Sequence, residues 1–317
     1  MFCARAGAKL VVAVDNAAII DKARENIFHN GLDGVITCLR GQMEEVKLPV
    51  ESVDIIVSEW MGYCLLYEAM LPSVLWARDR YLAPDGLMVP SHAALWLAPV
   101  SDPDYVADHV TFWRDVYGFD MKASKRTSLV TSITSVAPRP LPPFAADAAL
   151  VPVQDGIYSD VRVEVVPASS LCGRPSLFRL FDLHSVTKED LVGTFTWESA
   201  LSPGVESLEG FLAWFDVYFA DRRSEQLVPP NASAQEWVAR GTDRVAFTTG
   251  PHGRETHWRQ GLLLCQPPLT AERWGDTALL SGEISLSVPA DDPRALALRV
   301  EWTEPSGTKR TQAWAVQ

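Results

Sequence analysis

The sequence contains few cysteines, and none of the patterns in which cysteines usually act together. Its five cysteines, Cys3, Cys38, Cys64, Cys172 and Cys265, are widely scattered and form no CxxC pair. This spacing argues against a zinc site and against a disulfide framework. We therefore expect no bound metal and residence in a reducing compartment.

Long apolar runs and targeting segments are also absent from the sequence. No apolar run is long enough to cross a bilayer, and residues 1–9 lack the charged, apolar and cleavage regions of a signal peptide. We therefore expect no membrane association, and residence in the cytoplasm, the nucleus or both. The first residues instead predict the end of a helix that stops near Gly7.

The chain has no excess of positive charge. It has 317 residues, 28 Lys and Arg against 40 Asp and Glu, and a net charge of −12. This balance argues against direct binding to nucleic acid and favours attraction to basic partners. The hydrophobic fraction of 47% is typical of a globular protein, and the length allows two domains.

Strand-like and helix-like segments alternate through residues 1–90. Apolar runs and apolar periodicity predict these elements in chain order: a strand at 10–15, a helix at 17–30, strands at 35–39 and 52–57, a helix at 67–81, and a strand at 86–90. This alternation is typical of βαβ units over a parallel sheet. Ligands of such sheets bind at the carboxyl ends of the strands, where Asp15, Glu44 and Glu59 would lie.

After Pro90 the pattern changes to short alternating segments rich in Trp and Val. Examples are residues 93–98, 161–165, 211–218 and 283–288. Residues 91–317 therefore predict a mostly antiparallel β domain, either a barrel or a sandwich. An aromatic helix-like piece with a Pro-rich tail interrupts it at 106–146, and residues 221–255 predict a long exposed loop.

Two glutamates, Glu59 and Glu68, stand among aromatic residues in the run SEWMGYCLLYE at residues 58–68. Burying a carboxylate without a cationic partner is costly, so we expect a cation to meet them. A guanidinium is the natural candidate, because its N–H fork binds carboxylates bidentately. The alternative is a structural ion pair with Arg78 or Arg80, and the spacing alone does not decide between the two.

Three other places in the sequence each allow a functional and a structural interpretation. Asp15 at a strand tip suits a ribose diol, but a solvated acid or a helix cap is favoured when it is taken alone. Met43 and Glu44 suit a loop that lines an adenine, or a surface turn. His257 and Trp258 suit the wall of a cation pocket, although a lone histidine there is most often structural.

Taken together, these segments resemble the protein arginine methyltransferases. Residues 58–63 with Glu68 resemble the double-Glu loop of that family, and Thr256-His257-Trp258 resembles its Thr-His-Trp loop. The Trp-Met-Gly-Tyr wording resembles the subclass that makes monomethylarginine and asymmetric dimethylarginine. Further matches follow in order over nearly the whole chain, at residues 12–15, 44–46, 82–86 and 116–121.

The resemblance implies an α/β fold: a partial Rossmann-like S-adenosylmethionine-dependent methyltransferase domain at 1–90, followed by an antiparallel β-barrel-like domain at 91–317. A dimerisation arm would occupy about residues 106–142 and form a head-to-tail homodimer. The expected function is methylation of arginine in basic, Arg/Gly-rich proteins.

By residue match, Asp15 would bind the ribose of S-adenosylmethionine, and Met43 and Glu44 would contact its adenine. The Gly-rich turn that carries the cofactor in the family has no counterpart, and Gly7 does not replace it. The sequence is therefore expected to be truncated at its N-terminus, to bind the cofactor poorly and to dimerise poorly.

Five residues match the family's arginine pocket. Glu59 and Glu68 would clamp the substrate guanidinium, and Met61 would influence how many methyl groups are added. His257 and Trp258 would close the pocket. A guanidinium stays protonated and positively charged. Two carboxylates would therefore orient it and offset its repulsion from the positive sulfonium of S-adenosylmethionine. His257 would either relay a proton or brace one of the glutamates.

Two other classes of function remain. One is an inactive relative that acts as a binding or dimerisation module, which the missing Gly-rich turn favours and the intact acids oppose. The other is a small-molecule or nucleic-acid methyltransferase, which would not explain both acids and the Trp-bearing loop. Residues 221–255 exceed the usual connection of the family, and their extra length is interpreted as tolerated filler rather than as a shaper of substrate access.

Overall fold

The computed structural model describes residues 1–121, 156–221, 228–270, 278–304 and 306–316. They fall into two compact units: an α/β unit of Met1–Trp60 and Met70–Val89, and a β unit of Met61–Ala69 and Pro90–Gln317. The short segment Met61–Ala69 therefore folds with the β unit, although both of its neighbours along the chain fold with the α/β unit. Among the described residues, no helix combines the length and the apolar character needed to cross a membrane.

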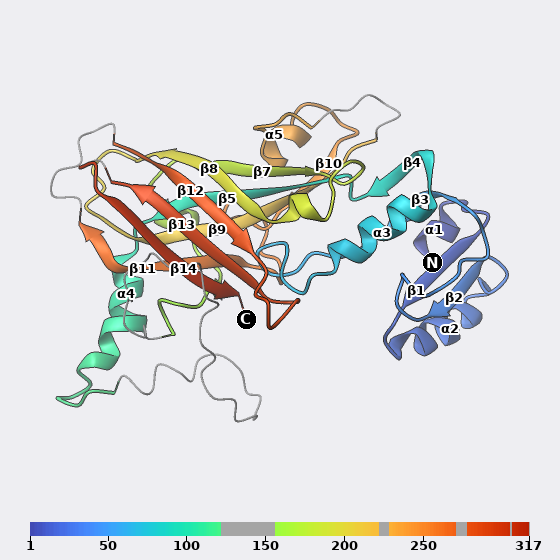
Figure 1. Ribbon diagram of the computed structural model, residues 1–317, viewed down its shortest axis with the longest axis horizontal. Helices are drawn as coiled ribbons and strands as arrows, with labels where there is room; N and C mark the ends of the chain where they lie inside the picture. Colours follow the sequence, from blue (N-terminus) through green and yellow to red (C-terminus); the bar gives the residue numbers. More distant parts are fainter. Residues whose placement is uncertain (122–155, 222–227, 271–277, 305, 317) are drawn as a thin grey trace. The chain divides into compact units, whose positions relative to one another are not determined.

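Parallel strand pairs form the α/β unit (Figure 1). Strand β1 pairs with β2 and strand β3 pairs with β4, in two separate two-stranded sheets. The predicted strand–helix–strand order is confirmed. In chain order the elements are α1 (Phe2–Arg5), β1 (Val11–Asp15), α2 (Ile19–His29), β2 (Ile36–Arg40), β3 (Val53–Val57), α3 (Leu71–Tyr81) and β4 (Leu82–Val89).

Local sequence explains the helix boundaries in this unit. Gly7 follows α1 with a φ of +99°, which ends the helix as predicted. Helix α2 buries Ile20 and Ile27, which share one face of the helix. The helix predicted at 67–81 is wrong in its first turn, because Glu68 and Ala69 have positive φ angles that a right-handed helix excludes. Strand β4 also begins earlier than predicted, directly after α3.

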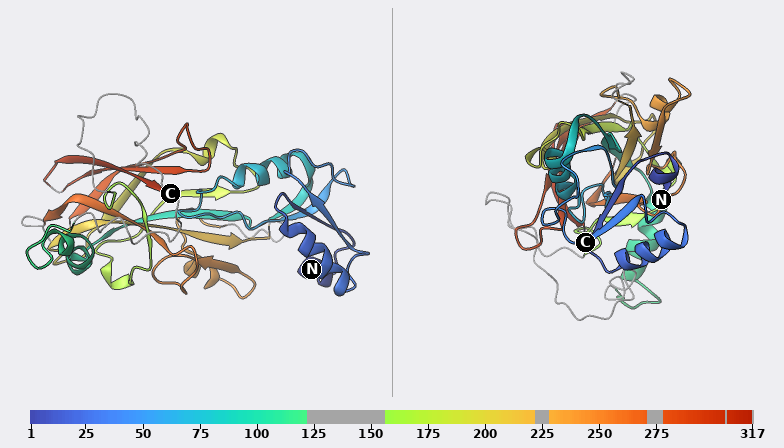
Figure 2. Two further views of the ribbon diagram at one scale, coloured as in Figure 1. Left: turned by 90° about the horizontal axis from the view of Figure 1, so that it is seen from below. Right: turned by 90° about the vertical axis from the view of Figure 1, so that its right-hand side faces the viewer.

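Two antiparallel sheets form the β unit (Figure 2). One has the strand order β6-β11-β9-β5-β7 with β10 added to β9, and the other has the order β14-β13-β12-β8. The antiparallel prediction is confirmed, and the described strands form two sheets rather than a closed barrel. The strands are β5 (His92–Val100), β6 (Arg162–Glu164), β7 (Ser176–Asp182), β8 (Gly193–Ala200), β9 (Ser207–Phe219), β10 (Val245–Thr248), β11 (Gln260–Thr270), β12 (Leu279–Ser287), β13 (Leu296–Thr303) and β14 (Lys309–Val316).

Aromatic side chains join the two sheets. Phe211 of β9 lies edge-on between Trp197 of β8 and Trp302 of β13, with ring centroids 5.3 Å apart in each pair. Such pairs contribute about 0.5–1.5 kcal/mol beyond their buried area. At one margin of the two sheets, the indole N–H of Trp314 donates to the carbonyl of Leu264 over 3.1 Å. The core of the β unit is therefore continuous between its sheets.

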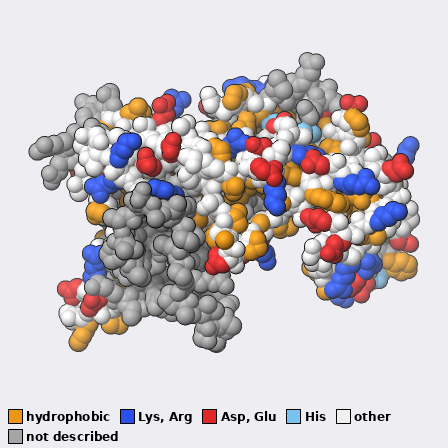
Figure 3. All heavy atoms as spheres, in the orientation of Figure 1, with side chains coloured by type: hydrophobic (Ala, Val, Ile, Leu, Met, Phe, Trp, Pro, Cys, Tyr) orange, Lys and Arg blue, Asp and Glu red, His pale blue; other side chains and the backbone are white. Residues whose placement is uncertain are grey.

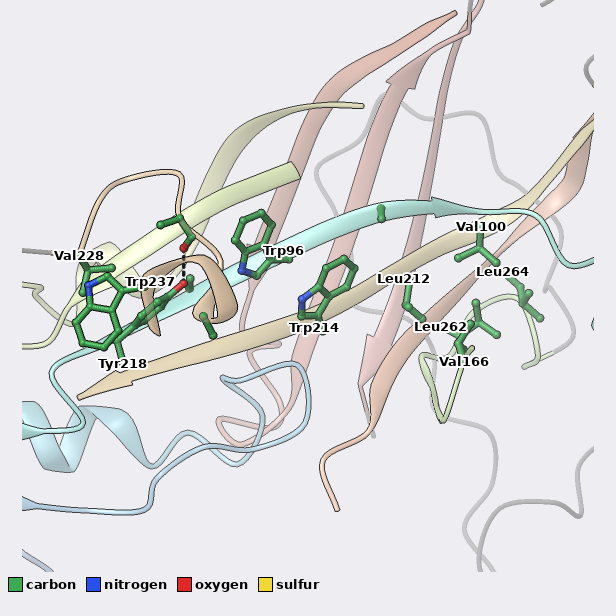
Figure 4. Packing of buried hydrophobic residues seen from close by; sticks show 14 of the residues in the cluster. Trp96, Val100, Val166, Leu212, Trp214, Tyr218, Val228, Trp237, Leu262 and Leu264 are labelled. Carbon is green, nitrogen blue, oxygen red and sulfur yellow. Dashed lines mark hydrogen bonds between the residues drawn. The ribbon is translucent and has the colours of Figure 1, made fainter. Parts of the chain in front are cut away.

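A second aromatic cluster fixes a segment that the sequence predicted as loop. Figure 4 shows Trp96 and Trp214 on neighbouring strands and Tyr218 against Trp237. Trp237 belongs to α5 (Ala234–Val238), a helix that starts with a capping box between Ser233 and Glu236. The prediction of a loop over 221–255 is wrong where α5 and β10 form.

Short helical turns follow β5. They are α4 (Pro103–Val106), a π-helical turn η1 (Ala107–Thr111) and a 3-10 turn η2 (Phe112–Arg114). They confirm the start of the predicted aromatic helix-like piece. The expected dimerisation arm continues to about residue 142, and its part beyond residue 121, with the Pro-rich tail, lies outside the described residues. Two further 3-10 turns are η4 (Ala168–Ser170) and η5 (Glu189–Leu191).

Candidate active site

Residues Met61–Ala69, the part of the double-Glu loop that folds with the β unit, have a strained backbone. Four of the non-glycine residues among them have positive φ: 50° at Cys64, 71° at Leu65, 77° at Glu68 and 53° at Ala69. Each such residue costs roughly 1–3 kcal/mol and persists only where its surroundings determine the conformation. Contacts from outside the loop must therefore hold it.

Close packing supplies part of this support. Leu65 is fully buried and exchanges two backbone hydrogen bonds with Gly62, of 2.9 and 3.0 Å. A Cβ on Gly62 would lie 1.9 Å from the carbonyl oxygen of Tyr67, so only glycine fits there. Cys64 packs against Gly261 of β11, where a Cβ would lie 2.6 Å from the Cys64 sulfur. The two glycines thus allow the loop to turn tightly and to approach the sheet.

The Thr-His-Trp segment supplies a second support. The Trp258 indole Nε1–H donates to the carbonyl of Met61 over 2.8 Å, although the two residues are 197 positions apart in the chain. The indole packs on Phe215 and on Phe247, each with ring centroids 5.7 Å away. His257 is exposed, and its ring lies 3.8 Å from that of Trp258. The structure thus brings Met61 and Trp258 together, two residues that the sequence had singled out separately.

Glu68 meets a guanidinium within the β unit. Its backbone N–H donates to the Arg294 carbonyl over 2.8 Å, and the Arg294 Nη2 lies 3.7 Å from its carboxylate. The side chains are 44% and 68% exposed, so the ion pair is weakly stabilising. Sequence reasoning missed Arg294, because the pattern around it is an ordinary polar turn. Glu59 and Glu68 are both exposed, so burial does not by itself require a cation beside them.

Glu59 follows β3 in the α/β unit. The preceding residue, Ser58, donates its backbone N–H to the carbonyl of Val89 over 3.0 Å, which continues the pairing of β3 with β4. Glu59 therefore lies at the carboxyl end of a parallel strand, as predicted. Of the two arginines that the sequence offered as partners, Arg78 donates to Asp79 and Arg80 lies over the Tyr81 ring.

Asp15 and the Met43–Glu44 turn lie at the carboxyl ends of neighbouring parallel strands. The backbone N–H of Gly41 donates to the Asp15 carbonyl over 3.1 Å, which places this turn beside the end of β1. One carboxylate oxygen of Asp15 accepts from the Ala17 N–H, whereas the cap residue of α2, Ala18, has no side-chain cap hydrogen bond. Glu44 is exposed and accepts from Ser73, whereas Met43 is half-buried. An acid and an apolar side chain at adjacent strand ends suit a ribose and an adenine.

The described part of the chain shows no group of three or more His, Cys, Asp or Glu side chains arranged to hold a metal ion.

Family models cover almost the whole chain. One described as "Arginine methyltransferase oligomerization subdomain" matches residues 91–307, and one described as "Methyltransferase domain" matches residues 1–89. The chain belongs to the protein arginine methyltransferase family. The resemblance drawn from the double-Glu and Thr-His-Trp loops is thereby confirmed at the level of the family.

Curated relatives agree with this assignment. "Ribosomal protein arginine N-methyltransferase rmt3" of Schizosaccharomyces pombe is 37% identical over 302 residues, which cover 95% of this chain and 48% of that relative. "Protein arginine N-methyltransferase 1" of the same organism is 36% identical, covering 96% of this chain and 74% of that relative. The chain thus spans about half of the first and three quarters of the second.

Solved structures share the fold. The Trypanosoma brucei PRMT1 enzyme-prozyme heterotetrameric complex with AdoHcy matches with a TM-score of 0.77 and 27% identity, over 100% of this chain and 84% of that one. The Arabidopsis thaliana protein arginine methyltransferase 10 has a TM-score of 0.71 at 24% identity, over 99% and 84%, which supports the fold alone. The expected methyltransferase-like α/β unit followed by an antiparallel β unit is the architecture of the family.

Proposed function

We propose that this chain methylates arginine side chains of proteins and produces monomethylarginine and asymmetric dimethylarginine. The observation that carries the proposal is the hydrogen bond from Trp258 to the Met61 carbonyl. It holds the double-Glu loop against the Thr-His-Trp segment, and both loops carry the residues that the family uses. The asymmetric product follows from the Trp-Met-Gly-Tyr wording of residues 60–63.

S-adenosylmethionine, when bound, supplies the methyl group. Asp15, Met43 and Glu44 would hold it at the carboxyl ends of β1 and β2, in the roles of diol acceptor and adenine contacts.

The pocket residues act on the substrate guanidinium. Glu68 presents an exposed carboxylate that lies 3.7 Å from the guanidinium of Arg294. Together with Glu59 it would orient the substrate arginine through charged hydrogen bonds, which are stronger than neutral ones. His257, which is exposed, would take up a proton or brace a glutamate. The buried Met61 side chain would limit the room beside the reacting nitrogen.

Charge and composition point to basic, Arg/Gly-rich proteins as substrates. The net charge of −12 attracts them. On the face shown in Figure 3, Asp and Glu side chains lie interspersed with Lys and Arg, so attraction would be spread along a disordered segment. We further propose a homodimer formed through the arm that starts after β5, in a chain of the cytoplasm or nucleus.

Methyl transfer to an Arg/Gly-rich peptide from labelled S-adenosylmethionine tests the proposal. Glu59→Gln and Glu68→Gln should each reduce kcat about 100- to 1000-fold, because each removes a charge aimed at the guanidinium. Glu198→Gln, at an exposed position of β8, is the matched control and should leave kcat unchanged. Hydrolysis of the product and chromatography should show asymmetric dimethylarginine.

Two results would refute this assignment. Methyl transfer that persists in both glutamine variants would show that the two acids do not act on the substrate guanidinium. A wild-type chain that binds cofactor and forms dimers without transferring methyl groups would instead support an inactive dimerisation module, the role suggested by the oligomerisation subdomain at residues 91–307.

A further inference from the structure

We propose that Phe247 of β10 is a positioning residue for arginine methylation. It stacks on Trp258, keeps the indole N–H directed at the Met61 carbonyl, and so fixes the double-Glu loop. The kinetic part of this inference rests on the proposed function. The mechanical part, in which Phe247 holds the loop through Trp258, does not.

Two rings hold the Trp258 indole from different directions. Phe247 lies nearly parallel to it, at 15° between the ring planes, whereas Phe215 meets it edge-on at 71°. A parallel contact fixes the plane of the indole, and an edge contact restricts its rotation within that plane. Phe247 is itself supported by Phe219, whose ring lies 6.3 Å away. The indole is therefore directed by β9 and β10 together.

Strand β10 is firmly attached to the sheet beneath this stack. Phe247 is paired with Val217 of β9 in an antiparallel register. Directly after β10, the Thr249 backbone N–H donates to the Phe215 carbonyl over 2.9 Å, and the Phe215 N–H donates to the Thr249 hydroxyl over 3.1 Å. The Gln260 side chain also donates to the Thr249 carbonyl. Thr249 and Gln260, which flank the Thr-His-Trp segment, are therefore joined to each other. Phe247 contacts Trp258 from a strand that is paired along the sheet.

The effect of this stack reaches the loop through one hydrogen bond. The Met61 carbonyl accepts from Trp258 at the start of a loop whose four positive φ angles relax without outside contacts. A smaller side chain at position 247 leaves one indole face uncovered, so the indole tilts and the hydrogen bond to Met61 weakens. The ring of Phe247 packs on Phe219 and Trp258, neither of which is an acid of the expected guanidinium clamp, so Phe247 acts through Trp258.

These contacts give a role to part of residues 221–255, whose extra length was expected to be tolerated filler. In the structure, β10 from this segment forms half of the aromatic support under Trp258. We therefore expect β10 to influence how far methylation proceeds, because the position of the Met61 backbone sets the position of its side chain.

Hydrogen exchange followed by mass spectrometry tests the mechanical part without requiring activity. The reporters are loop amides that donate to backbone carbonyls, at residues 62 and 65–69. In the full chain, Phe247→Leu should accelerate their exchange about 2- to 10-fold, the amount expected for one lost aromatic pair. Phe247→Tyr keeps the ring and should restore exchange close to the wild-type rate.

Phe195→Leu is the matched control. Phe195 of β8 is also half-buried and also pairs with one phenylalanine, Phe178, at 6.3 Å. It should lose similar packing without changing exchange in the loop. Unchanged loop exchange in Phe247→Leu, or equal acceleration in Phe195→Leu, would overturn the proposal.

The kinetic part is read from the products. Phe247→Leu should lower kcat more than it changes KM and should alter the ratio of dimethylarginine to monomethylarginine, and Phe247→Tyr should recover the wild-type ratio. A wild-type chain that binds S-adenosylmethionine yet transfers no methyl group would refute the proposed function and leave the exchange result to judge Phe247. A normal product ratio beside accelerated exchange would overturn the link between β10 and the extent of methylation.

Discussion

Replacing Gly261 with alanine should push β11 into the double-Glu loop. The new Cβ would lie 2.6 Å from the Cys64 sulfur and 2.9 Å from a Val161 methyl carbon, and both side chains are buried. Favourable contacts between such atoms lie near 3.5–4.0 Å, so the neighbours must move. Overpacking of this kind costs about 1–3 kcal/mol. We expect the melting temperature of the β unit to fall by about 2–10 °C.

A double-mutant cycle with Cys64→Ala shows whether the clash is the cause. Removing the sulfur opens space for the new methyl group, so the double variant should be more stable than the sum of the single effects by about 0.5–3 kcal/mol. Differential scanning calorimetry of the four proteins measures this. Cys265→Ala, at another buried position of β11, is the control and should combine additively with Gly261→Ala. Additive effects with Cys64→Ala would refute the reasoning.

The Cys64 thiol offers a second measurement. Burial raises its pKa to about 12, so it stays protonated at neutral pH and should react slowly with an alkylating reagent. Displacement of Cys64 in the Gly261→Ala variant should accelerate that reaction. An unchanged rate would mean that the loop had absorbed the extra methyl group without moving.

Two further predictions concern ionisable groups of the β unit. Burial raises the pKa of Asp216 in the folded chain, more than the hydrogen bond from the Ala234 N–H lowers it. The contribution of Asp216 to stability is therefore full below the unfolded pKa of about 4, and it is lost as pH rises through the folded pKa. Asp216→Asn should therefore gain melting temperature relative to wild type between pH 4 and pH 7, and parallel pH curves would contradict this. Arg294→Ala removes an exposed ion pair but leaves the backbone bond to Glu68 intact, so urea unfolding should change by less than about 1 kcal/mol. Under the proposed function, in which Glu68 binds the substrate guanidinium, Arg294 would compete for Glu68, so KM for an Arg/Gly-rich peptide should fall by up to about fivefold. A rise in KM would contradict that competition.

Regular apolar patterns made most of the fold predictable. The runs at 10–15, 35–39 and 52–57 became β1, β2 and β3, because a buried strand needs little more than a continuous apolar segment. The prediction failed for the first turn of the helix at 67–81, because a contact distant in the sequence determines its conformation. Glu68 is held outside the helical region by its bond to Arg294, which no local pattern encodes.

The prediction of a loop over 221–255 failed for the opposite reason, because local signals for a helix were present in the sequence. Ser233 and Glu236 have the spacing of a capping box, and Trp237 stands in the helix that follows. The surrounding Pro, Ser and Gly residues outweighed them in the prediction. Burial of Trp237 against Tyr218 stabilises this helix, and such a tertiary contact is visible only in the fold.

Sequence motifs singled out the residues of the proposed site but not the residues that support them. Met61 and Trp258 were singled out because of their neighbours in two specific motifs. Phe215, Phe247 and Arg294 hold those motifs in place, yet each belongs to an ordinary strand or turn. Positioning residues of this kind depend on the packing between distant segments and carry no local signature.

The hydrogen bond between Met61 and Trp258 also has a consequence for synthesis on the ribosome. Its partners are 197 residues apart, so the loop emerges long before the segment that holds it. Contacts of such separation form late, after the intervening chain has closed. The backbone bond from Glu68 to Arg294 can form only after residue 294 has been made, and a nascent chain released earlier would carry every acid of the motif without this support.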